Sequence, residues 1–138
     1  MKRILSLILA VIMCLSLCAC GTTEPAAGLW ENAIYTENTE IGNGEKTLTI
    51  DVVAEEKTVT ITVNTDKDTL GEALIDEGFI AGDEGAYGLY VKFVNGIEAD
   101  YDKTQTYWGI TKNGESVMTG VDQIEISDGE KYEFTYTK

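Results

Sequence analysis

The chain has 138 residues, a formal net charge of −14 at pH 7 and no histidine. The negative charge repels phosphate backbones and anionic headgroups, which argues against nucleic-acid binding. The absence of histidine removes the commonest general base, the commonest metal ligand and the base of any Ser–His or Cys–His pair. We therefore expect a binding protein rather than an enzyme, with no catalytic residue, no bound metal and no obligatory cofactor.

Residues 1–20 have the layout of a secretory signal peptide. A basic start precedes an apolar run over residues 4–17, and Cys20 stands at the expected cleavage point. The run is shorter than the roughly 20 residues that a membrane-spanning helix needs. The pattern resembles a bacterial lipoprotein signal, in which the chain is cut before a lipidated cysteine. We predict a signal peptide over 1–19, lipidation of Cys20, and an extracytoplasmic protein anchored to the cell membrane by lipid.

The rest of the chain reads as a tether followed by one domain. All three cysteines lie at or before Cys20, so the domain has no disulfide and no thiol nucleophile. Residues 20–28 form a short tether after the lipidated cysteine, and residues 29–138 form the domain. Trp30 and Tyr35 make the segment over 29–44 too aromatic for a free linker, which predicts an arm packed against the domain.

The domain begins with a predicted strand pair and a short helix. Residues 47–52 and 58–63 alternate β-branched or leucine positions with a mostly threonine face, and a turn at 55–57 separates them. Thr69 is the expected helix N-cap, with Glu72 three residues later as in a capping box. Gly78 is the expected end of this helix.

The second half of the domain is predicted to be mostly strands. The glycine-rich segment over 82–88 reads as a loop. Strands are predicted over residues 89–94, 106–112 and 132–136, with turns at Asn95-Gly96, Asn113-Gly114 and Asp128-Gly129. This order of elements predicts an α+β fold, with one short helix packed on a small, mostly antiparallel or mixed sheet. A β-grasp-like arrangement is the nearest common architecture.

Two groups of residues are candidate sites. The acidic loops, Asp83-Glu84 and Asp100-Tyr101-Asp102, could contribute oxygens to calcium, but they lack EF-hand spacing and such pairs arise by chance in an acidic chain. Five aromatic residues around the two hairpins offer flat amphipathic surface, although aromatic residues also complete small cores. These five are Tyr87, Tyr90, Tyr101, Tyr107 and Trp108.

Several segments together resemble a known family. They are Thr69-Leu70-Gly71-Glu72-Ala73-Leu74, Tyr87-Gly88-Leu89-Tyr90-Val91-Lys92-Phe93-Val94-Asn95-Gly96, Tyr107-Trp108-Gly109-Ile110 before Asn113-Gly114-Glu115, Gly120-Val121-Asp122 and Tyr132-Glu133-Phe134-Thr135-Tyr136. Their succession resembles bacterial lipoprotein domains of unknown function that are related to the C-terminal domain of transcobalamin and intrinsic factor. The resemblance covers about residues 29–138.

The resemblance implies a transcobalamin C-terminal-like fold and a ligand site at an aromatic hairpin. It maps ligand contacts to Tyr107, Trp108 and Gly109, with Asn95 and Gly96 in the turn beside them. It implies cobalamin or another corrinoid as the bound ligand in uptake, with a transporter or a larger binding subunit as partner. We also expect Trp108→Ala to abolish binding without unfolding the domain. The alternative is a cell-surface interaction or adhesion module that uses a sheet face or edge and binds no small ligand.

Overall fold

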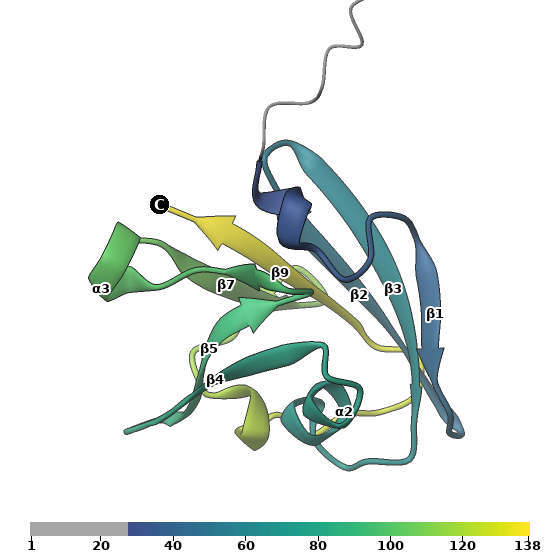
Figure 1. Cartoon of the computed structure of the whole chain (residues 1–138). Helices are drawn as coiled ribbons and strands as arrows, with labels where there is room; N and C mark the ends of the chain where they lie inside the picture. The colour runs from purple at the N-terminus through teal and green to yellow at the C-terminus, as the bar shows by residue number, and fades with distance from the viewer. Residues whose placement is uncertain (1–27) are drawn as a thin grey trace, which may run out of the picture.

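A computed structural model describes residues 28–138 (Figure 1). The predicted signal peptide, the predicted lipidation site Cys20 and all but the last residue of the predicted tether lie outside these residues. Within the described part of the chain, no helix is long and apolar enough to cross a membrane.

The larger sheet has six strands in the order β1–β3–β2–β9–β7–β8. These strands are β1 (Thr39–Gly42), β2 (Lys46–Ala54), β3 (Lys57–Thr65), β7 (Tyr107–Lys112), β8 (Glu115–Ser116) and β9 (Lys131–Thr137). The last strand, β9, lies in the centre, parallel to β2 and antiparallel to β7. The fold is therefore the predicted α+β, β-grasp-like arrangement, in which an early hairpin and a late strand share one mixed sheet.

The predicted strand pair is confirmed as the antiparallel hairpin β2–β3, which turns at Glu55 and Glu56. Its apolar positions face the core, and Ile50 and Ile61 are opposite each other in the register. Threonine dominates the other face because successive side chains of a strand alternate between the two faces. The hydrophobic pattern thus fixes which face of the sheet is buried.

A smaller sheet, one α-helix and two 3-10 helices contribute side chains to the core on the apolar face of the larger sheet, whereas the second α-helix has no buried residue (Figure 1). The smaller sheet contains β4 (Ile80–Gly85), β5 (Gly88–Val94) and β6 (Ile97–Glu98), and the helical elements are η1 (Leu29–Asn32), α2 (Leu70–Asp76), α3 (Tyr101–Thr104) and η2 (Val121–Gln123). Helix α2 is capped as predicted, because the Thr69 hydroxyl accepts from the Glu72 amide at 3.2 Å. Leu70 and Leu74 are fully buried, so packing stabilises a helix too short to be stable alone.

The prediction of a loop over residues 82–88 is wrong for most of that segment. Residues up to Gly85 form β4, which pairs with β5, and only Ala86 and Tyr87 form the turn. A Cβ on Gly82 would collide with the Tyr90 carbonyl, so glycine permits a close approach of the two strands. Sheet pairing therefore overrides the weak strand propensity of Gly, Asp and Glu here.

The arm predicted over residues 29–44 does pack against the domain. The Trp30 indole Nε1 donates to the Ala54 carbonyl at 3.0 Å, and the Lys57 ammonium lies 4.8 Å from the centre of the Trp30 ring. Tyr35 packs at the margin of the core, and the segment continues into β1 at one edge of the large sheet. The aromatic content of the arm therefore reflects packing.

Candidate functional site

A groove of about 660 Å³ lies between the β4–β5 hairpin, strand β7 and the segment after β8. It is lined by Gly85, Ala86, Tyr87, Gly88, Leu89, Tyr90, Val91, Tyr107, Trp108, Gly109, Ile110, Ser116, Val117, Met118, Thr119, Gly120 and Thr137. Its volume falls within the roughly 300–1,000 Å³ range of small-molecule sites. We call it the β5–β7 groove.

Strand β7 forms the floor of the β5–β7 groove. Trp108 is only 6% exposed, its Nε1 donates to the Ile97 carbonyl at 3.2 Å, and its ring meets Tyr136 edge-on at 5.5 Å between centroids. Tyr107 is 39% exposed, and Gly109 lies between Trp108 and Ile110 in the floor. Three predicted ligand contacts therefore line the groove, but Trp108 is mainly a core residue.

The main chain of β7 has an unpaired edge on the groove side. Within the described chain, β8 pairs with β7 only at Thr111 and Lys112. One further bond follows, from the Val117 amide to the Ile110 carbonyl at 2.9 Å. Because main-chain groups alternate sides along an antiparallel strand, the Trp108 amide and carbonyl point to the same side as those of Ile110. They are available to orient a ligand.

The β4–β5 hairpin forms one wall of the groove. Tyr87 stands at its turn and is 83% exposed, whereas Leu89 is half-buried and Val91 is buried. Gly88 has a φ of +106°, a conformation that L side chains rarely adopt, and a Cβ there would collide with the Asp122 carboxylate. The sequence Ala86-Tyr87-Gly88 thus makes a tight turn with its aromatic ring at the rim.

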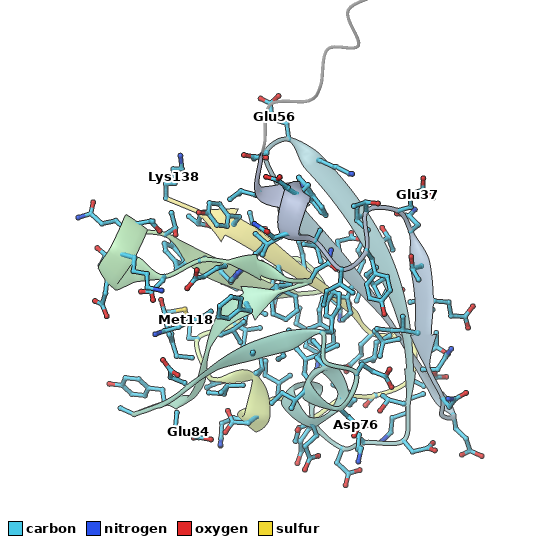
Figure 2. The ribbon with its side chains drawn as sticks, in the orientation of Figure 1. Glu37, Glu56, Asp76, Glu84, Met118 and Lys138 are labelled. Carbon is cyan, nitrogen blue, oxygen red and sulfur yellow. The ribbon has the colours of Figure 1, made fainter. Side chains whose placement is uncertain are left out.

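The opposite wall follows the Asn113-Gly114 turn, which is confirmed as a hairpin between β7 and β8. Met118 is 88% exposed on this wall, and Figure 2 shows it at the side of the molecule near the β4–β5 hairpin. Sequence reasoning missed the segment over 116–120 as a wall. The predicted turn showed that this segment returns along β7, but its meeting with the β4–β5 hairpin depends on tertiary structure.

The lining of the β5–β7 groove carries no Asp, Glu, Lys or Arg. The whole chain, by contrast, has 24 acidic and 10 basic side chains. The groove is therefore a neutral surface of aromatic rings, aliphatic side chains, hydroxyls and glycine backbone within an acidic molecule. Such a lining favours a ligand with a flat apolar face, and the surrounding negative field disfavours an anion.

Asn95 and Gly96 lie outside the groove lining, at the β5–β6 turn. Asn95 is fully buried, and its side chain accepts from the Tyr35 amide at 2.8 Å and donates to the Tyr35 carbonyl at 2.7 Å. A Cβ on Gly96 would collide with the Asn32 carbonyl. The turn predicted here is confirmed, and the structure places its residues against the N-terminal arm.

The acidic segments predicted as loops lie in β4 (Asp83-Glu84) and at the start of α3 (Asp100 to Asp102), and they form ion pairs with lysines. Lys92 lies 2.6 Å from Asp83 and 3.6 Å from Asp100, and Lys103 lies 3.0 Å from Glu98. Burial acts to raise the pKa of the Asp100 carboxyl, but the Asp102 amide and the two ammonium groups outweigh it, so this pKa lies below its ordinary value. No group of three or more potential metal-ligating side chains occurs within residues 28–138.

Comparison with known proteins identifies the family. Residues 67–138 match the family described as a domain of unknown function, DUF4430. The chain belongs to this family. No curated protein matches the chain in sequence.

Two solved structures share the fold of this DUF4430 protein. One is a crystal structure of a protein from Ruminococcus gnavus, described as a candidate metal-binding protein. It is 38% identical, with a TM-score of 0.64, and the match covers 68% of this chain and 98% of that one. The other is haptocorrin in complex with Cbi, at 18% identity and a TM-score of 0.55. That match covers 71% of this chain but only 26% of haptocorrin, so the fold corresponds to a minor part of that protein. The predicted resemblance to the transcobalamin C-terminal domain is confirmed at the level of fold.

Proposed function

We propose that this DUF4430 protein is a lipid-anchored extracytoplasmic protein that binds a small molecule in the β5–β7 groove, with a corrinoid as the first candidate. The observation that carries the proposal is the neutral, aromatic lining of the groove in an otherwise acidic chain. The complex of haptocorrin with Cbi supports the choice of a corrinoid as the probe.

The proposed mechanism is burial of an apolar ligand face against the groove, with the polar edge of the ligand held by main-chain groups. Tyr107 and Tyr87 supply aromatic surface at the floor and the rim. The amide and carbonyl of Trp108 supply a donor and an acceptor along the unpaired edge of β7. The lining contains no histidine, so binding relies on stacking and hydrogen bonds.

Calorimetric titration of the purified protein with cobinamide and cobalamin tests this function. Micromolar or tighter binding supports a corrinoid site, and cobyrinic acid is the charge control because it carries carboxylates in place of amides. We expect cobyrinic acid to bind at least tenfold more weakly than cobinamide. No heat with either cobinamide or cobalamin would contradict the corrinoid assignment.

Lipid anchoring is tested separately, since it rests on residues 1–20. Expression of the full chain with a labelled fatty acid should give a labelled protein in the membrane fraction. Cys20→Ser should remove the label and release the protein. Retention of label in the Cys20→Ser variant would contradict anchoring at this residue.

The alternative function is protein interaction at the same face. Met118 and Tyr87 are 88% and 83% exposed, and Met and Tyr are enriched at protein interfaces. A protein partner would bury both side chains without entering the floor. Cross-linking from position 118 in cells would then capture one defined membrane protein, whereas a small-molecule site leaves this position uncross-linked.

A further inference from the structure

Asp122 is not part of the lining of the β5–β7 groove, but its carboxylate lies against both the β4–β5 hairpin and the wall at Gly120. Its carboxylate Oδ1 accepts from the Leu89 amide at 2.7 Å, at the start of β5. Gly88 of β5 is paired with Gly85 of β4 next to the turn. Because main-chain groups alternate sides along an antiparallel strand, those of the next residue, Leu89, point away from β4. The carboxylate therefore completes a hydrogen bond that no strand supplies.

The hairpin and the opposite wall are joined at the same point by a second bond. The Gly120 amide donates to the Tyr87 carbonyl at 3.0 Å. A Cβ on Gly120 would lie 2.7 Å from both the Asp122 Oδ1 and the Leu89 nitrogen. Glycine at 88 and 120 thus allows the carboxylate to sit between the two walls.

Asp122 is itself fixed to the core through helix α2. The main chain of Asp122 packs directly on Gly71, where a Cβ would lie 2.9 Å from the Asp122 Cα. The Leu70 amide donates to the Ile124 carbonyl at 2.9 Å, and neighbouring Val121 is fully buried. The carboxylate therefore has a rigid base, while the Tyr87 turn that it holds is exposed.

We propose that Asp122 is a positioning residue for the β5–β7 groove: its carboxylate fixes the β4–β5 turn, and with it the Tyr87 rim, against the wall at Gly120. The expected effect on ligand binding rests on the proposed function, in which the groove is a ligand site. It makes no use of Asp122 as a ligand contact, since that side chain lies outside the lining. If the turn were loosened, one wall of the groove would no longer be held in a fixed position.

The test compares Asp122→Ala with Asp122→Asn and with a matched control, Asp128→Ala. Asp128 accepts from the Thr47 amide at 2.7 Å, which is the same kind of bond at the same distance but away from the groove. Amide hydrogen exchange of the free protein follows Leu89 and Gly120, and calorimetry follows cobinamide. Asparagine retains an oxygen acceptor, so Asp122→Asn should show the amide exchange rates and the cobinamide affinity of the unmodified protein.

We expect Asp122→Ala to speed exchange at Leu89 and Gly120 at least tenfold, with exchange in β2 unchanged, and to weaken cobinamide binding at least tenfold. Asp128→Ala should do neither. Unchanged amide exchange at Leu89 in Asp122→Ala would overturn the proposal. Equally faster amide exchange in β2 would also overturn it, because it would show general destabilisation of the fold. If the unmodified protein binds no cobinamide, the corrinoid assignment fails, and the exchange data alone decide whether Asp122 holds the turn.

Discussion

The floor and the rim of the β5–β7 groove hold their aromatic side chains in different ways. At the floor, Trp108 is almost fully buried, with its indole N–H bonded and its ring against Tyr136. At the rim, Tyr87 is 83% exposed on a turn fixed through its main chain. Trp108 in the floor contributes to the stability of the fold, whereas Tyr87 at the rim is free to contact a ligand. Substitutions should therefore separate stability from binding.

The largest loss of stability is expected for Trp108→Ala. Removing a buried indole leaves a cavity between β7 and Tyr136, and we expect a loss of about 3–5 kcal/mol in the free energy of unfolding. Chemical denaturation measures this loss. The sequence predicted that this variant would stay folded and lose binding. If Trp108→Ala were as stable as the unmodified protein, the prediction from the sequence would stand and Trp108 would not be a core residue.

A smaller loss is expected for Asn95→Ala. Its buried side chain bonds both main-chain groups of Tyr35, and the variant leaves them unpaired, which costs about 2–3 kcal/mol. The matched control is Asn113→Ala, at a turn of similar φ whose side chain accepts one bond, from Lys131 at 3.3 Å. Equal losses in the two variants, by thermal denaturation, would contradict the structural role of Asn95.

A pH-dependent loss is expected for Glu130→Gln. Burial acts to raise the pKa of the Glu130 carboxyl, but hydrogen bonds from the Tyr132 hydroxyl and the Lys112 ammonium outweigh it and hold this pKa below its ordinary value. The carboxylate therefore stabilises the fold above the pKa of the unfolded chain, and the contribution is lost as pH falls through the folded pKa. We expect Glu130→Gln to cost about 1 kcal/mol at pH 7 and progressively less as the pH is lowered from 7 towards 3. A difference that stays constant over this range would contradict the assignment.

The smallest loss of stability is expected for Tyr87→Ala. Its ring is exposed, so the free energy of unfolding should change by less than about 0.5 kcal/mol, as at most surface sites. Ile34→Ala, at an exposed apolar side chain outside the groove lining, is the control for generic loss of surface. A large drop in melting temperature for Tyr87→Ala alone would show that the rim contributes to the core.

The sequence predicted the elements whose signals are local. Alternation placed β2 and β3, Thr69 marked the start of α2, and both Asn-Gly pairs form hairpin turns. Strand β4 escaped prediction because its pairing with β5 is decided by tertiary contacts that allow glycine and acidic residues in a strand.

The candidate site was predicted only in part, since exposure is not a local property. The two Asn-Gly turns have nearly the same backbone, yet Gly96 packs against the Asn32 carbonyl and Gly114 faces open space. Tyr107 and Trp108 are neighbours in sequence, but one lines the groove with an exposed ring and the other completes the core. Asp122 belongs to a segment that carries the family resemblance, but nothing in the sequence showed that its carboxylate bonds the Leu89 amide. Only the assembled fold shows which side chains meet.

The most direct test of the β5–β7 groove as a ligand site is calorimetric titration of cobinamide into the protein and its Tyr87→Ala/Tyr107→Ala double variant, with the melting temperature of each. We predict micromolar or tighter binding to the unmodified protein. In the double variant we predict at least tenfold weaker binding, with the melting temperature nearly unchanged. Binding of equal strength in both proteins would show that the ligand lies elsewhere and would contradict the account.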